Sequence, residues 1–247
     1  MPTDQVKDWI RTEAEAALWW PFVSPAVGAD PFAQIDIGAG TTNISIFRIV
    51  PQHSSMGWSK ASVSFFAATS PPTGMDAIDK ALTDWKGGKD VFKWRGLEDE
   101  LLFGTIGKQV ISHEVRLIRN AYRQSINRAF STHLQRHAER YAWETHKIFF
   151  LGGGSHVDCL VKQLLISPLD DVTPLIRAEL DVPPDLRLAD GKNVPRMMFP
   201  HIAVAYGLSA FSAETPNVEA PGQTPPMGPV NPPSRRYQNI EMDEWRY

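Results

Sequence analysis

The stretch AQIDIGAGTTNISIFRI, residues 33–49, contains two strand-forming segments joined by a short turn. Residues 32–37 are expected to form a buried strand, and residues 43–50 alternate with the two-residue period of a second strand. A third strand is expected at residues 61–69, which gives an antiparallel meander. Gly38 and Gly40 favour a tight turn, because glycine adopts backbone angles that are closed to other residues.

The same turn has the composition of an anion site. Successive backbone N–H groups in such a turn form a concavity that binds anions, and Thr41 and Thr42 add hydroxyl donors. Asp36 could hold Mg²⁺ through water, since Mg²⁺ keeps several waters and takes few carboxylates. On these residues alone, an ordinary hairpin with a capping aspartate is the alternative.

A second glycine loop lies at residues 148–165, IFFLGGGSHVDCLVKQLL. A predicted strand runs into Gly152, Gly153 and Gly154 and is followed by a helix, an arrangement that puts a nucleotide at a helix N-terminus. A tight strand-to-helix connection is the alternative. The dinucleotide-binding fingerprint is excluded, because it needs glycine or alanine where Val157 stands.

The order of elements along the chain predicts an α/β domain with a mixed sheet and a helical insertion at about residues 77–145. A helix is expected to open at GMDAID, residues 74–79, and a longer helical region at residues 97–143. HIAVAYGLSAFS, residues 201–212, is expected to form the final helix. Residues 214–247 are rich in proline and are predicted to form a disordered tail.

Composition narrows the functional classes. The 247 residues carry a net charge of −3, which makes nucleic acid an unlikely partner. The single cysteine excludes an internal disulfide and a cysteine-based metal site. No apolar run approaches the ~20 residues that span a bilayer, so no membrane association is expected and the predicted location is the cytoplasm.

Four separated motifs occur in the order of a known family: the turn after Asp36, GMDAID, the Gly-Gly-Gly-Ser loop and AVAYG. In this order the chain resembles the second lobe of the actin, heat-shock-chaperone and sugar-kinase ATPase superfamily, most closely the seventy-kilodalton chaperones and their bacterial relatives. The resemblance implies a ribonuclease H-like α/β lobe at residues 31–213. Residues 1–30 would be the remnant of a connecting helix and loop from the first lobe.

The resemblance also implies roles for individual residues and the cofactors ATP or ADP and Mg²⁺. The β- and γ-phosphates would be wrapped by Gly38, Ala39, Gly40, Thr41 and Thr42. Asp36 and Thr41 would lie near the metal and the attacking water, and Glu13 would be the catalytic glutamate near the metal. Adenosine would be bound by Gly152, Gly153, Gly154 and Ser155, with His156 beside them, and residues 203–207 would form the closing helix.

The chain departs from the family's pattern at three positions. Asn43 stands where the chaperones usually have aspartate, His156 replaces an arginine that packs on adenine, and His201 replaces an acidic residue. A histidine ring at position 156 could still stack.

The first lobe has no counterpart before Glu13, so we expect a piece of a longer protein or one half of a split pair, with poor unaided hydrolysis. A first-lobe polypeptide or a client protein would then be the partner. The alternatives are a non-catalytic interaction or scaffold module that keeps the fold, and a fragment of an actin-like filament subunit.

Overall fold

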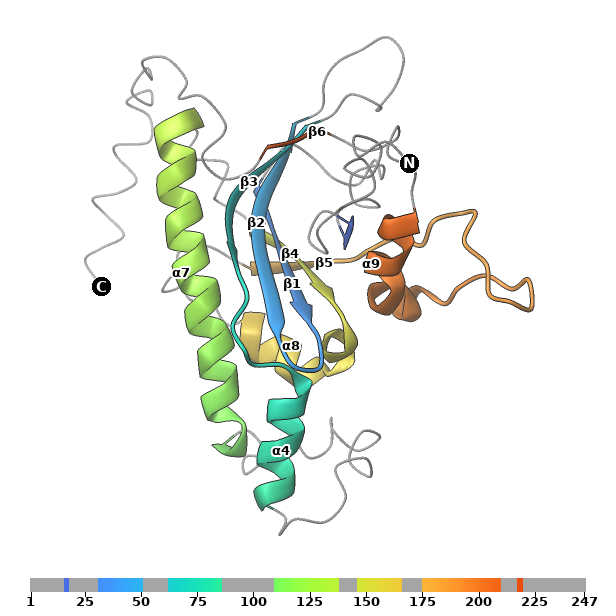
Figure 1. Cartoon of the computed structure of the whole chain (residues 1–247), viewed down its shortest axis with the longest axis horizontal. Coiled ribbons are helices and arrows are strands. Elements are labelled where there is room, and N and C mark those ends of the chain that lie inside the picture. The colour runs from blue at the N-terminus through green and yellow to red at the C-terminus, as the bar shows by residue number, and fades with distance from the viewer. Residues whose placement is uncertain are drawn as a thin grey trace, which may run out of the picture.

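A mixed sheet of six strands forms the centre of the fold, in the order β5-β4-β1-β2-β3-β6 (Figure 1). The computed structural model describes residues 16–17, 31–50, 62–85, 109–137, 146–165, 175–209 and 217–219. The strands are β1 Pro31–Ile37, β2 Thr42–Val50, β3 Ser62–Thr69, β4 His146–Leu151, β5 Leu175–Ala178 and β6 Asn217–Glu219. The first three strands form the predicted antiparallel meander, and β4 runs parallel to β1. The predicted α/β class with a mixed sheet is confirmed.

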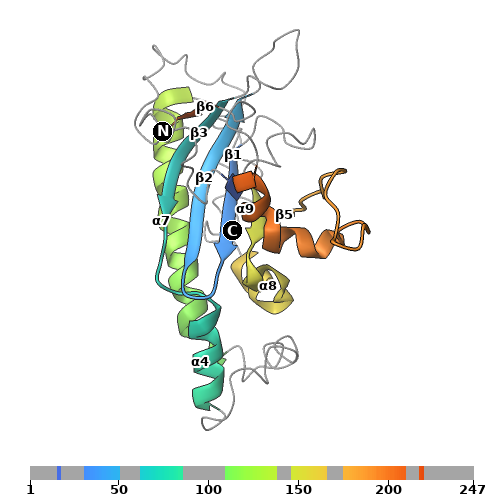
Figure 2. The same ribbon diagram turned by 45° about the vertical axis from the view of Figure 1, so that its right-hand side comes forward.

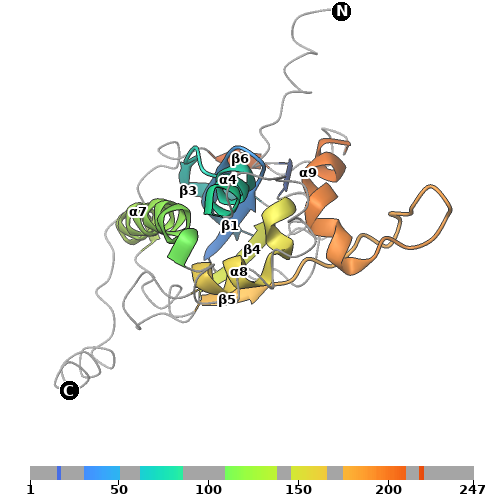
Figure 3. The same cartoon turned by 90° about the horizontal axis from the view of Figure 1, so that it is seen from below.

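Helices cover both faces of this sheet. They are α4 Met75–Trp85, α7 Ser112–His137, α8 Asp158–Leu165 and α9 Phe199–Ser209, with short 3-10 turns η3 Gly153–His156 and η4 Arg196–Met198. Figures 2 and 3 show α7 and α9 on opposite sides of the strands. Among the described residues, no helix combines the length and apolar character that a membrane crossing requires.

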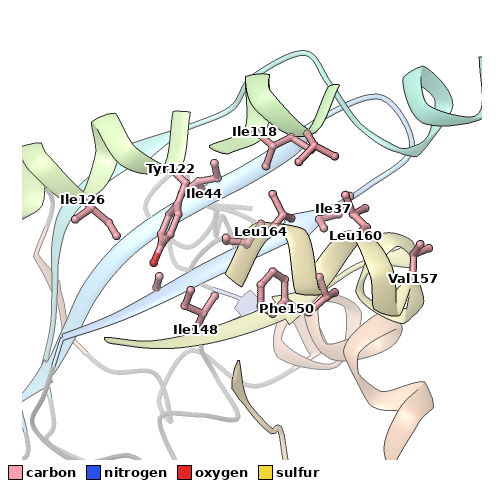
Figure 4. Close-up of a cluster of buried hydrophobic side chains, with 14 of the residues drawn as sticks. Ile37, Ile44, Ile118, Tyr122, Ile126, Ile148, Phe150, Val157, Leu160 and Leu164 are labelled. Carbon is pink, nitrogen blue, oxygen red and sulfur yellow. The ribbon is translucent and has the colours of Figure 1, made fainter. Parts of the chain in front are cut away.

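The face under α7 and α8 carries the larger apolar core. Because side chains alternate between the two faces along β2, Ile44 and Ile46 lie on this face. Phe47 of the same strand lies on the opposite face. Side chains of α7 that recur every three or four residues meet those of α8 above the strands, as Figure 4 shows for Ile118, Tyr122, Ile126, Leu160 and Leu164. α7 is therefore packed directly on the sheet.

The opposite face is built from aromatic rings. Phe32 stacks on Phe47 with ring centroids 6.0 Å apart and on Phe149 with centroids 5.6 Å apart. Phe199 of α9 is fully buried in the same cluster. This packing fixes the N-terminal end of α9 near the end of β4.

The final helix begins two residues earlier than the sequence predicts, at Phe199 instead of His201. Pro200 is then the second residue of the helix, where its missing N–H costs nothing because the first N–H groups of a helix have no partner within it. Burial of Phe199 accounts for the longer helix. The described part of the predicted helical region at residues 97–143 is helical over residues 112–137.

The prediction of a disordered tail at residues 214–247 is wrong for three of these residues. Asn217–Glu219 forms β6 and pairs in parallel with Ser62–Ser64 of β3. A strand at the edge of a sheet leaves a row of backbone groups unpaired, and β6 satisfies part of that row. The rest of the predicted tail lies outside the described residues.

The described residues include little of the predicted connecting segment at residues 1–30. Ala16 and Ala17 are helical and buried, and Glu13 lies outside the described residues. Gly207 of α9 faces this pair closely, because a Cβ at Gly207 would overlap the carbonyl oxygen of Ala16. The two backbones are in direct contact there.

We expect Gly207→Ala to lower the free energy of unfolding by about 1–3 kcal/mol, because the added methyl group forces the two segments apart. Helix propensity alone predicts the opposite sign, a gain of about 1 kcal/mol. Urea unfolding followed by circular dichroism measures the difference. Ala205→Gly, at an exposed position of the same helix, calibrates the propensity effect, and a Gly207→Ala protein more stable than wild type would contradict the close contact.

Candidate functional site

The turn between β1 and β2 holds three exposed residues, Ala39, Gly40 and Thr41. The N–H of Gly38 donates to the carbonyl of Thr41 at 3.0 Å, and the N–H of Thr42 donates to the carbonyl of Pro71 at 3.2 Å. The described residues offer no hydrogen-bond partner to the N–H groups of the three exposed residues. These three amides are the donors that the turn can present to a ligand.

The N-terminus of α4 orients those amides. The carbonyls of Gly38 and Ala39 accept hydrogen bonds from the N–H groups of Met75 at 2.9 Å and Asp76 at 2.8 Å. In a trans peptide the C=O and the following N–H point in opposite directions, and the described residues contain no cis bond. The N–H groups of Ala39 and Gly40 therefore point away from α4, side by side.

Gly74 is needed for this docking, because a Cβ there would lie 2.6 Å from the carbonyl oxygen of Gly38. Two side chains add to it: the Thr42 hydroxyl donates to the carbonyl of Thr73 at 2.6 Å, and the Ser70 hydroxyl donates to the Asn43 side-chain oxygen at 2.6 Å. Thr42 is fully buried. The Thr42 hydroxyl therefore holds the turn in place. Of the two threonines, Thr41 is the exposed one.

The second glycine loop follows β4 and lies against the end of β1. The parallel register sets Asp36 opposite Leu151, which puts Gly152 beside the Asp36 side chain. A Cβ at Gly152 would overlap the Oδ1 atom of Asp36 and lie 2.5 Å from the carbonyl oxygen of Ile37. The half-buried Asp36 carboxylate thus lies where the two predicted motifs meet.

The three glycines have different surroundings. Gly152 has φ 73° and ψ −177°, a conformation essentially restricted to glycine. A Cβ at Gly154 would overlap the side chain of Ile37, whereas a Cβ at Gly153 would meet nothing within 4 Å. Gly152 and Gly154 are therefore required by the fold, and Gly153 is the exposed tip of the loop.

Four hydrogen bonds fix the shape of this loop. Ser155 donates both its N–H, at 3.2 Å, and its hydroxyl, at 2.7 Å, to the carbonyl of Gly152. The Arg177 guanidinium donates to the carbonyl of Ser155 at 3.3 Å, and the N–H of Gly152 donates to the carbonyl of Pro200 at 3.2 Å. The buried Ser155 hydroxyl is thus engaged within the loop, and neither Arg177 nor Pro200 is signalled by the sequence motifs.

His156 of the second glycine loop and His201 of α9 are in contact. Their rings stack with centroids 3.9 Å apart and planes 7° from parallel. Burial lowers the pKa of His156 below its ordinary value of 6.5, and the nearby His201 and Arg177 lower it further. One face of the His156 ring, predicted to be available for stacking on a base, is covered by His201.

The donors at this end of the sheet suit a phosphate group with a hydrated Mg²⁺ ion. Three exposed amides and the Thr41 hydroxyl are donors, and the Asp36 carboxylate is the kind of ligand that Mg²⁺ binds through water. Within the described residues, no group of three or more His, Cys, Asp or Glu side chains is arranged to hold a metal directly.

No protein-family model matches the sequence. No curated protein matches it either.

Three solved structures are similar to the chain in backbone arrangement. The PilM-PilN type IV pilus biogenesis complex matches 81% of this chain and 51% of its own, at 15% identity and a TM-score of 0.46. The ethanolamine utilization protein EutJ from Carboxydothermus hydrogenoformans matches 80% and 55%, at 12% identity and 0.44. The apo psk41 ParM protein matches 80% and 47%, at 14% identity and 0.40. The chain spans about half the length of each of these structures.

We expect Gly152→Ala to destabilise the protein by about 1–3 kcal/mol, because the residue has a conformation that side chains rarely adopt and its Cβ would overlap Asp36. Gly153→Ala, one residue later, should change the free energy of unfolding by less than about 0.5 kcal/mol. Urea unfolding of both variants tests this contrast. Equal effects at the two positions would contradict the described approach of the loop to β1.

Proposed function

We propose that this chain is the nucleotide-binding lobe of an actin-like ATPase, of the chaperone-like kind. The observation that carries the proposal is the position of Asp36, whose carboxylate lies against Gly152 and directly precedes the turn with three exposed amides. A carboxylate at the end of β1 and the oriented N–H groups of the turn that follows it suit a metal-bound polyphosphate. The proposed location is the cytoplasm.

In this proposal the N–H groups of Ala39, Gly40 and Thr41 bind the β- and γ-phosphates of ATP. Gly38 permits the turn, and Thr42 holds it in place through its bond to Thr73. Asp36 orients the water shell of Mg²⁺, and the ion, when bound, neutralises charge on the phosphates. The Thr41 hydroxyl lies on the exposed side of the turn, where it can orient a water.

The adenosine would lie along residues 152–156. Gly153 is exposed and has open space around it, so a ligand can approach its backbone closely. Ser155 acts by fixing the loop instead of through a free hydroxyl, because its hydroxyl donates to Gly152. The proposed role of Glu13 near the metal concerns a residue outside the described part of the chain.

We propose that efficient hydrolysis needs a second lobe, supplied by another segment or another polypeptide. Phosphoryl transfer depends on donors positioned around the transferring group. Loss of a single preorganised donor commonly reduces the rate by about 10²–10³. With donors from one side only, the chain should bind nucleotide and turn it over poorly.

A non-catalytic interaction module is the second candidate. Two hydroxyls of the proposed site, on Thr42 and Ser155, are already engaged within the protein, and the ring of His156 is partly covered. A module that keeps the fold to contact a partner protein and binds no nucleotide would have the same internal hydrogen bonds and the same covered ring. Direct binding measurements separate the two candidates.

We expect calorimetry with Mg²⁺ and ATP to detect binding by the wild-type chain, and Gly153→Asp to weaken it at least about tenfold, or about 1.4 kcal/mol. The added carboxylate has room at this position and would repel the phosphates. Gly153→Asn is the matched control, with the same size and no charge, and should bind more tightly than Gly153→Asp. Absence of heat with the wild-type chain would contradict nucleotide binding and favour the interaction module.

A further inference from the structure

The first turn of α9 is fastened to the second glycine loop by two neighbouring residues. Pro200 accepts a hydrogen bond from the N–H of Gly152 at 3.2 Å, and His201 stacks on His156 with ring centroids 3.9 Å apart. These contacts hold both ends of the five-residue loop Gly152–His156. His201 itself is exposed, so its ring is retained there by the stack and not by burial in the core.

The surroundings of His156 favour an uncharged ring. Its Nε2 atom is buried and has no hydrogen-bond partner among the described residues. Protonation of both ring nitrogens would leave a charged Nε2–H donor at a buried position without an acceptor, which is costly. His201 would then face a cation at stacking distance.

The charged groups around the pair do not compensate such a cation. β5 contributes Arg177, which is itself positive, and α8 contributes Asp158, which pairs with Arg177 at 3.5 Å and with Lys162 at 3.6 Å. From β4, the Lys147 ammonium lies over the Phe32 ring. From β1, Asp36 lies against Gly152 at the start of the loop, at the end opposite His156. No carboxylate in the described surroundings is thus paired with either imidazole.

We infer that His201 is a positioning residue for the loop Gly152–His156, acting through its ring stack on His156, and that the stack requires the His156 ring to be neutral. Under the proposed function, on which this inference rests, the stack keeps the adenosine loop in its binding shape. Protonation of His156 separates the rings, loosens the loop from α9 and weakens nucleotide binding.

The direction of the pH dependence follows from His156. Its pKa is lower in the folded protein than in the unfolded chain, so the unfolded chain binds more protons between the two values. The contribution of the stack to stability is therefore complete above the ordinary pKa of about 6.5 and is lost as the pH falls below it. Acidification should loosen the loop.

Hydrogen exchange without nucleotide tests the stack directly. We expect the protection factors of the Gly152 and Ser155 amides in the wild-type protein to fall about threefold to tenfold between pH 7.5 and pH 5.5. His156→Phe keeps a ring at the stacking position and removes the nitrogen whose protonation opposes the stack, so it should preserve most of the protection at both pH values. His201→Ala should lose protection at both. A His156→Phe protein with the wild-type pH dependence, or a His201→Ala protein with wild-type protection, would overturn the inference.

His113→Phe is the control for removing a histidine elsewhere, because His113 is exposed on α7 and contacts Arg116. It should keep the wild-type response to pH. Mg²⁺-ATP affinity is then measured for wild type and His156→Phe at both pH values, and we expect the ratio of their affinities to change about threefold to tenfold. Protonation of ATP itself affects both proteins equally and cancels in this ratio.

The two measurements separate the two proposals. Absence of nucleotide binding by every variant, with the exchange results as expected, rejects the proposed function and leaves the positioning of the loop by His201 established. Nucleotide binding with an unchanged affinity ratio and unchanged protection rejects the role of His201 and leaves the nucleotide site intact.

Discussion

The parallel pairing of β1 with β4 is the constraint on which the candidate site depends. It sets Asp36 opposite Leu151, so that the chain leaving β4 must pass directly over the end of β1. Only glycine fits at 152 and 154, because a Cβ at either would overlap atoms of Asp36 or Ile37. The same pairing joins two motifs that lie more than a hundred residues apart in the sequence. The glycines are thus required for packing whether or not a ligand is bound.

A second consequence concerns the direction of backbone dipoles. The first N–H groups of α4 donate to the carbonyls of Gly38 and Ala39. Because these peptides are trans, the N–H group that follows each carbonyl points in the opposite direction. A helix N-terminus is usually described as the anion-binding element. Here the helix N-terminus is occupied by the turn, and the turn presents the free amides. In the proposed nucleotide site, the anion-binding donors therefore belong to the hairpin and not to the helix that holds it.

His156 of the second glycine loop and His201 of α9 lie far apart in the sequence and are in contact in the fold. Their rings stack with centroids 3.9 Å apart. Contact between α9 and the glycine loop is maintained by ring packing, which does not require a pair of opposite charges.

The sequence by itself determined the strands of the meander, the two glycine turns and the apolar stripe of α7, because each depends on local periodicity and on residues with special backbone freedom. The tertiary structure alone decided which donors are free. Thr42 and Ser155 look like ligands in the sequence, but their hydroxyls bond to carbonyls brought near by packing. Arg177 and β6 became visible only when distant segments met, because a hydrogen bond between segments leaves no periodic signal in either one.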